Sequence, residues 1–200
     1  KELYKLLKIK PRSDSDCEVI IHLYKKFGIQ DTLKLLDGVF AFALLDNNGL
    51  DTKMYVARDP YGVRPLYMFQ NETLIGFGSS MTVLQDLTCA KIQHFQPGCC
   101  MTLKLPPTIS AIWEISEIYR YFNFPFSSIG TRNSYDYGVI FENIRTLLTN
   151  AVYKRCVTSD RPIACLLSGG LDSSLIAALV NKYHKEHNLP QLETYCIGVQ

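Results

Sequence analysis

The sequence has no hydrophobic run long enough to span a lipid bilayer, and its first residues, KELYKLLKIK, lack the apolar core of a signal peptide. The longest strongly apolar run extends from Val39 to Leu45 and falls far short of the roughly 20 residues that a spanning helix needs. These absences predict a soluble, cytoplasmic protein that works without a membrane.

An excess of charge of one sign is also missing. The 200 residues include 21 Lys and Arg and 19 Asp and Glu, a formal net charge of +2. Because nucleic-acid binding depends on a concentrated basic surface, we expect no nucleic-acid partner. Hydrophobic residues make up 47% of the chain and aromatic residues 12%, which is enough to build a packed core. The composition therefore argues against a disordered or fibrous protein.

The seven cysteines include no CxxC pair and are odd in number, so the sequence predicts neither a disulfide framework nor a zinc site. We expect reduced thiols, most of them buried. His184 and His187 lie close together near a predicted helix end, but no third ligand accompanies them. We therefore expect a solvated helix face there rather than a metal site.

The first part of the chain predicts a helix followed by several short strands. Ser15 and Glu18 have the S-x-x-E spacing of a capping box, in which Ser15 would cap the backbone amide of Glu18. Apolar residues then recur at helical spacing up to Gly28, which suits the left-handed position beyond a helix end. The expected strands lie at residues 36–46, 54–57, 65–69, 73–77 and 98–105. Such a pattern predicts an α+β sandwich.

The organisation changes near residues 128–134, where turn-forming residues carry no periodicity. Beyond this boundary the pattern predicts a long helix and then a strand, a helix and a second strand. These elements are expected at residues 140–152, 163–167, 175–180 and 193–199. The separation of Leu166 and Ile197 along the chain is that of one βαβ unit, about 30 residues.

The segment between the first of these strands and its helix carries the strongest chemical signal. Gly169 and Gly170 let the backbone turn tightly and approach a ligand, and the following helix offers unpaired amides and the positive end of its dipole. Hydroxyl donors for phosphate oxygens are supplied by Ser168, Ser173 and Ser174. Asp172 would repel a bare anion unless Mg²⁺ accompanied it. Since the lysine of a Walker loop is missing, the predicted ligand is a leaving pyrophosphate.

The sequence LLSGGLDSS at residues 166–174 resembles the pyrophosphate-loop motif of the ATP pyrophosphatases. Three further motifs precede it, and the whole order is similar to that of the glutamine-dependent asparagine synthetases. These motifs are SDCEVI at 15–20, LDGVFAFA at 36–43 and RDPYGVRPLY at 58–67. Four ordered motifs are far more specific than one.

This resemblance implies two domains of different fold. Residues 1–130 would be the C-terminal part of a class II glutamine amidotransferase domain, an incomplete N-terminal-nucleophile sandwich of αββα type. Residues 131–200 would be the N-terminal part of an ATP pyrophosphatase domain built on a parallel α/β sheet. The chain would then be an internal fragment of a longer enzyme, and a homodimer is left open.

The family reaction forms β-aspartyl-adenylate from aspartate and ATP with release of pyrophosphate, and ammonia from glutamine hydrolysis then displaces AMP to give asparagine. By position, Leu166 and Ile197 would contact the adenosine, and Asp172 would contact Mg²⁺. The implied ATP-binding residues are Leu166, Ser168, Gly169, Gly170, Leu171, Asp172, Ser173, Ser174 and Ile197.

The resemblance also assigns roles in the first domain. Asp16 would hold the α-amino group of glutamine, although an acidic residue in a first helical turn equally suits the helix dipole. The segment that contains Arg58, Asp59, Arg64 and Pro65 would support the glutaminase sheet without taking part in the chemistry. Without the resemblance, the same residues equally predict an exposed turn with a surface ion pair.

Two parts of the family's glutaminase are absent from these 200 residues: the N-terminal cysteine nucleophile and the asparagine-glycine oxyanion hole. Cys17 is expected inside a helix as a buried thiol and cannot replace the nucleophile. We therefore expect no catalytic residue in this chain and no activity from it alone. Ser80 and Thr82 stand where the family usually has glutamate and lysine, which puts the charged contacts of that turn in doubt.

Two alternatives to an asparagine synthetase stay open. One is a related ligase of the same domain organisation that acts on another carboxylate, as a β-lactam synthetase does. The other is a non-catalytic relative that binds a nucleotide or a partner, which the changes at Ser80 and Thr82 would suit.

Overall fold

The computed structural model describes residues 2–49, 51–87, 89–107, 112–124 and 136–198. The chain forms two compact units, Lys1–Ser128 (unit 1) and Ile129–Gln200 (unit 2), and each is described by itself. Among the described residues, none of the helices is both long and apolar enough to cross a membrane.

Unit 1 begins with two helices, α1 (Glu2–Leu7) and α2 (Glu18–Leu35). Gly28 interrupts α2 with φ 74° and ψ 175°, backbone angles that glycine adopts more easily than any other residue. The predicted end at Gly28 is thus a real break, but the chain resumes a helix beyond it. Thr32 stabilises the restart, because its hydroxyl donates to the Gly28 carbonyl at 2.7 Å.

Four antiparallel strands form the larger sheet of unit 1, here called sheet A. They are β1 (Ala41–Asn47), β2 (Thr52–Arg58), β6 (Cys99–Leu105) and β7 (Glu114–Arg120), in the order β1-β2-β6-β7. The predicted central hairpin is confirmed, since Ala41 pairs with Arg58 and Asn47 with Thr52. The sequence did not indicate β7, because a bulge opposite Thr102 and Leu103 breaks the alternation of apolar and polar residues along it.

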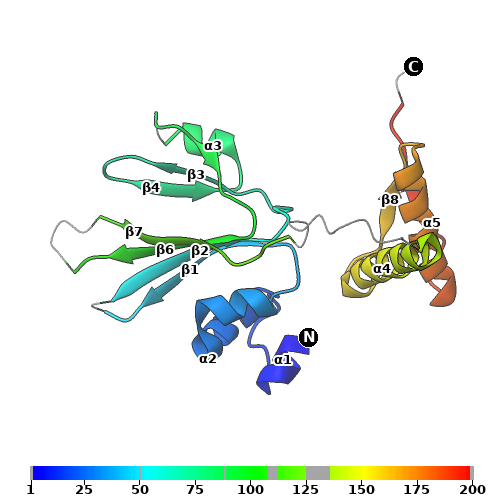
Figure 1. Cartoon of the computed structure of the whole chain (residues 1–200), viewed down its shortest axis with the longest axis horizontal. Coiled ribbons are helices and arrows are strands. Elements are labelled where there is room, and N and C mark those ends of the chain that lie inside the picture. Colours follow the sequence, from blue (N-terminus) through cyan, green and yellow to red (C-terminus); the bar gives the residue numbers. More distant parts are fainter. Residues whose placement is uncertain (1, 50, 88, 108–111, 125–135, 199–200) are drawn as a thin grey trace. The chain divides into compact units, whose positions relative to one another are not determined.

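A smaller sheet, sheet B, contains β3 (Tyr67–Gln70), β4 (Ile75–Gly78) and β5 (Gln93–His94) in the order β4-β3-β5. The two sheets face each other across an apolar core, and α2 covers the other face of sheet A. Helix α3 (Met81–Gln85) packs on sheet B through Leu84, which is 1% exposed. Unit 1 is therefore layered as helix, sheet, sheet and helix (Figure 1), the order that the resemblance implies.

The turn after β2 is held by a buried guanidinium. Arg58 is only 6% exposed, and its three nitrogens donate to main-chain carbonyls. Nε bonds Arg64 at 2.8 Å, Nη1 bonds Phe95 at 2.7 Å and Nη2 bonds Gly62 at 2.9 Å. Every nitrogen of the buried cation thus has a partner, which offsets part of its desolvation.

Asp59 performs the matching role for main-chain amides. It is 1% exposed, and its carboxylate accepts hydrogen bonds from the amides of Tyr61, Val63 and Arg64 at 3.0–3.1 Å. Gly62 adopts φ 65° at the apex of this turn. The supporting role expected for this segment is confirmed, whereas its reading as an exposed turn with a surface ion pair is wrong for Arg58 and Asp59.

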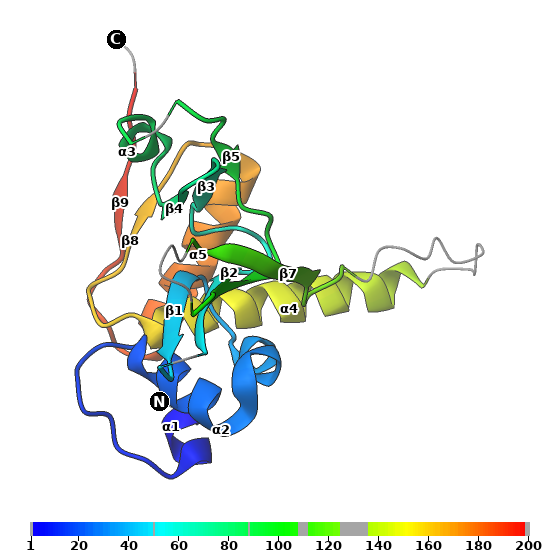
Figure 2. The ribbon, with the colours of Figure 1, turned by 90° about the vertical axis from the view of Figure 1, so that its left-hand side faces the viewer.

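Unit 2 contains a long helix followed by one βαβ unit. Its elements are α4 (Tyr137–Thr158), β8 (Ala164–Leu166), α5 (Leu171–Glu186) and β9 (Glu193–Tyr195). The two strands are parallel, with Ala164 opposite Glu193, and lie side by side in Figure 2. Val152 and Cys156 of α4 pack against Val180 and Tyr183 of α5. The parallel strands and the helix between them are as predicted.

Replacement of Arg58 by lysine should destabilise unit 1. A lysine keeps the charge, but its single ammonium group cannot reach three carbonyls, so we expect the free energy of unfolding to fall by about 2–3 kcal/mol. Urea unfolding followed by circular dichroism measures this. The control is Arg120→Lys, because Arg120 is exposed and its guanidinium donates to the Pro97 carbonyl at 3.2 Å. An equal effect of the two changes would contradict the role of Arg58.

Gly76→Ala tests the packing of sheet B. Gly76 lies opposite Phe69, which is fully buried, and a Cβ atom on Gly76 would lie 2.2 Å from Phe69 Cε1. The clash should lower the free energy of unfolding by about 1–3 kcal/mol. In contrast, a Cβ atom on Gly38 meets nothing within 4 Å. Gly38→Ala should therefore change stability by less than about 0.5 kcal/mol in the same urea titration.

Candidate functional site

The glycine and serine loop lies between the carboxyl end of β8 and the first turn of α5. Gly169 has φ 83°, a left-handed conformation that L side chains rarely adopt. Gly170 is the N-cap residue of α5 and provides no side chain to bond the first amides of the helix. These amides lie at the N-terminus of a 16-residue helix, the positive end of its dipole, where an anion is stabilised.

The three serine hydroxyls of the loop gather around Gly170. Ser173 Oγ donates to the Gly170 carbonyl at 3.1 Å, and Ser174 Oγ donates to the same carbonyl at 2.8 Å. Ser168 Oγ lies 3.0 Å from Ser173 Oγ. Because a hydroxyl rotates freely about its C–O bond, each of them can turn its proton toward a phosphate oxygen instead.

The remaining residues expected at the nucleotide are exposed. Leu166, Leu171 and Ile197 have 80%, 82% and 97% of their surface in solvent. Leu166 pairs with Tyr195, so Leu166 and the residues after β9 lie at the same carboxyl edge of the parallel pair. Ligands of open α/β sheets bind at this edge. The loop is open to solvent, as a phosphate site requires.

Asp172 is the one carboxylate of the loop, and it lies in the first turn of α5. In the part of the chain that the structure describes, no three His, Cys, Asp or Glu side chains gather as a metal cage. A single carboxylate still fits Mg²⁺, which usually binds one or two carboxylates together with substrate phosphates and water. The donor set at Asp172 therefore suits a nucleotide-bound ion and not a protein-only metal site.

The second predicted site residue, Asp16, lies in the irregular segment that leads into α2. Asp16 is exposed and accepts a hydrogen bond from Cys17 Sγ at 3.5 Å. Cys17 corrects two expectations, because it is the N-cap residue of α2 and it is exposed. Loss of water around the sulfur and the neighbouring Asp16 raise the pKa of the Cys17 thiol, which makes it a poor nucleophile at neutral pH.

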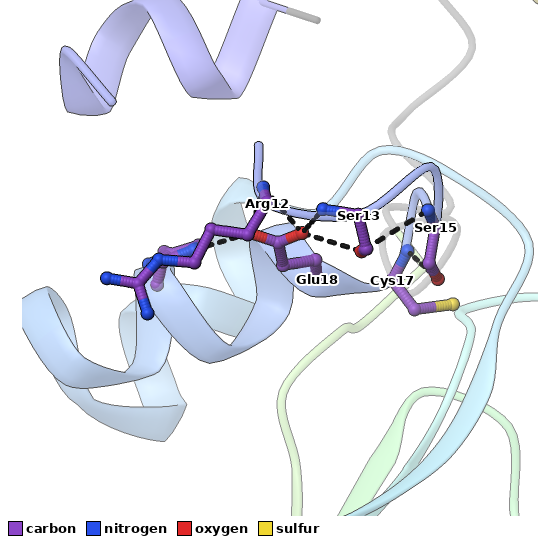
Figure 3. A network of polar contacts seen from close by, with 6 residues as sticks. Arg12, Ser13, Ser15, Cys17 and Glu18 are labelled. Atoms are coloured by element: carbon purple, nitrogen blue, oxygen red, sulfur yellow. Dashed lines mark hydrogen bonds and ion pairs between the residues drawn. The ribbon is translucent and has the colours of Figure 1, made fainter. Parts of the chain in front are cut away.

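The capping box predicted for α2 is absent, and Glu18 has a different role (Figure 3). The Glu18 carboxylate accepts hydrogen bonds from the Arg12 amide at 2.9 and 3.0 Å, the Ser13 amide at 2.7 Å and Ser13 Oγ at 2.6 Å. Ser15 Oγ accepts from the Cys17 amide at 3.3 Å and not from Glu18. The Glu18 carboxylate thus bonds Ser13 instead of Ser15. The sequence spacing alone could not show this choice of partner.

Other sequence expectations need correction. His184 is buried, at 7% exposure, and its Nδ1 lies 2.7 Å from the Pro190 carbonyl, so it does not form part of a solvated face. The expectation that most thiols are buried is wrong, because only Cys99, Cys100 and Cys156 are buried, whereas Cys89 and Cys196 are exposed like Cys17. All seven cysteines are free, as expected. Ser80 and Thr82 lie at the start of α3, where Ser80 is the N-cap residue without a side-chain cap bond and Thr82 is exposed.

Comparison with protein families matches the two units separately. Residues 1–86 match the glutamine amidotransferase domain family, and residues 143–200 match the asparagine synthase family. The first match covers α1 through α3 and includes Asp16, and the second covers the loop around Asp172. Each candidate site thus lies inside a segment with its own family match.

Similar full-length proteins include the glutamine-hydrolysing asparagine synthetases of Gallus gallus and Homo sapiens. The chain is 40% identical to the chicken enzyme over 198 residues and 37% identical to the human enzyme over 201 residues. Each alignment covers 92% of this chain but only 35% of the relative.

Among solved structures, a glutamine phosphoribosylpyrophosphate amidotransferase from B. subtilis aligns with 98% of this chain and 42% of its own length, with a TM-score of 0.47 and 18% identity. The assignment does not rest on that weak likeness. It rests on the two family matches and on the sequence identity to the full-length relatives. The chain is a homologue of the glutamine-hydrolysing asparagine synthetases and spans about a third of their length.

Proposed function

We propose that the full-length protein makes asparagine from aspartate, ATP and ammonia, and that it obtains the ammonia by hydrolysing glutamine. The observation that carries this proposal is the loop at residues 168–174, which presents two glycines, three hydroxyls and one carboxylate at the carboxyl edge of a βαβ unit. The corresponding domain assignment gives residues 1–130 to the glutaminase and residues 131–200 to the ATP pyrophosphatase.

In the proposed reaction, a β-carboxylate oxygen of aspartate attacks the α-phosphorus of ATP. The new O–P bond forms as the bond from the α-phosphorus to the bridging oxygen breaks, and pyrophosphate leaves. Ammonia then attacks the acyl carbon, AMP leaves with the electron pair of the C–O bond, and the nitrogen loses a proton to give the amide. Negative charge therefore builds up on a diphosphate during the first step.

The residues of the loop suit the stabilisation of that charge. The first amides of α5 and the hydroxyls of Ser173 and Ser174 would donate to the oxygens of the leaving pyrophosphate. Asp172 would hold Mg²⁺ beside the phosphates, and the ion supplies charge neutralisation when bound. Leu166 and Ile197 would provide apolar contact to the adenosine.

Unit 1 would contribute the glutamine-binding side. The exposed Asp16 carboxylate would accept hydrogen bonds from the α-ammonium group of glutamine. We assign no residue of the present chain as the nucleophile of glutamine hydrolysis.

The identity of the carboxylic acid is tested with the full-length protein, ATP and ammonia. Pyrophosphate release should require aspartate and should be accompanied by asparagine and AMP in equal amounts. Release with another amino acid and none with aspartate would favour a ligase of the β-lactam synthetase kind. No release with any carboxylate would favour a non-catalytic relative.

Asp172→Asn tests the loop itself. The change removes the charge expected at the metal, so ammonia-dependent asparagine synthesis should fall by about 100-fold or more. Glutamine hydrolysis should continue, because it does not use this loop. Asp160→Asn is the matched control, since Asp160 is an exposed acid of the same unit outside the loop. Normal synthesis by the Asp172 variant, measured as pyrophosphate release, would refute the loop assignment.

A further inference from the structure

The Glu18 carboxylate holds the segment that contains Asp16, in addition to starting helix α2. We propose that Glu18 is a positioning residue for the glutamine site, fixing residues 12–17 so that the Asp16 carboxylate is set to receive the α-ammonium group of glutamine. This inference rests on the proposed function of Asp16 and adds to it a residue that does not touch the substrate.

The Glu18 carboxylate gathers several donors. Glu18 accepts from the Arg12 amide, from the amide and hydroxyl of Ser13, and pairs with His22 Nε2 at 3.0 Å. The side chain of Glu18 is only 12% exposed, so these groups replace most of its water. Ordinary helix capping would need one such bond, whereas this arrangement ties two residues upstream of the helix to its first turn.

A relay of hydrogen bonds runs from Glu18 through Ser13 and Ser15 to the Cys17 amide (Figure 3). Ser13 Oγ donates to Glu18 at 2.6 Å and accepts from the Ser15 amide at 3.4 Å. Ser15 Oγ in turn accepts from the Cys17 amide at 3.3 Å. Asp16 thus lies between two residues whose main-chain amides are held, while its own side chain stays exposed.

Glu18 keeps its negative charge because its hydrogen-bond donors favour the ionised form. Hydrogen bonds from the Ser13 hydroxyl, from His22 and from the Arg12 amide lower the pKa of Glu18 to about 2. The carboxylate is therefore ionised at neutral pH, and it accepts with both oxygens. A glutamine side chain at position 18 would have the same size but only one oxygen. Its NH₂ group is a donor and would face the main-chain amides, which are donors too.

Glu18→Gln in the full-length protein is the central experiment. The KM and the dissociation constant for glutamine should each rise about fivefold or more, with kcat changed less than about twofold, because the segment loses its anchor but the chemistry does not. Ammonia-dependent asparagine synthesis should be unchanged, which shows that the protein is folded. Asp14→Asn is the matched control, because Asp14 is an exposed acid of the same segment, and it should leave the KM as it is.

A substrate without the α-amino group separates positioning from general damage. Glutaramate, the monoamide of glutaric acid, cannot bond Asp16, so Glu18→Gln should leave its kcat/KM within about twofold of the unmodified protein. An equal loss with glutaramate and glutamine would overturn the positioning role. If Glu18→Gln fails to fold, Ser13→Ala breaks the same relay with a smaller change, and an unchanged KM for glutamine in that variant would overturn the proposal.

Asp16→Asn separates a failure of the glutamine site from a failure of the positioning role of Glu18. If it raises the KM for glutamine about tenfold and Glu18→Gln does not raise it, the glutamine site stands and the positioning role fails. If Asp16→Asn has no effect, or if the unmodified protein neither binds nor hydrolyses glutamine, the assignment of Asp16 fails and the role of Glu18 fails with it. In the double variant, Glu18→Gln should add less than about twofold to the effect of Asp16→Asn.

Discussion

The arrangement of unit 1 depends on two buried charges that bond main-chain groups instead of one another. Arg58 ends a strand of sheet A, and its guanidinium reaches carbonyls on the segment that leads into sheet B and on Phe95. Asp59 holds the amides of the same turn. The hydroxyl of Tyr121 donates to the Arg58 carbonyl at 2.7 Å, and the Gly98 amide donates to the Asp59 carbonyl at 3.0 Å. Because buried polar groups without partners are costly, this turn has one favourable conformation, and it fixes how the two sheets of the unit face each other.

Much of the fold could be predicted because its signals are local. The break at Gly28, the hairpin of β1 and β2, and the βαβ unit each follow from glycine positions or apolar periodicity within a few residues. Strand β7 escaped prediction because the bulge places Ile115 and Ile118 three residues apart, a spacing that does not indicate a strand. The burial of Arg58 and Asp59 could not be derived from composition, because it arises from carbonyls and amides that only the folded turn brings together.

The two candidate sites also differ in how far the sequence could predict them. The loop around Asp172 is contiguous in sequence, so residue types and order alone predicted its place between a strand and a helix. The surroundings of Asp16 depend on which donors bond the Glu18 carboxylate. Two of these donors, Arg12 and Ser13, lie in an irregular segment that no periodicity describes. Exposure of Cys17 at the helix start was missed for that reason, since the predicted capping box would have made it the second residue of the helix.

The two parallel strands of unit 2 form a very small sheet with two open edges. Among the described residues β8 and β9 pair only with each other, and each is three residues long. Within the described residues the outer main-chain groups of both strands have no strand partner, and such edges can pair with a strand of another chain. Open edges of this kind favour pairing between copies, and a charged or proline substitution along either edge would disfavour it.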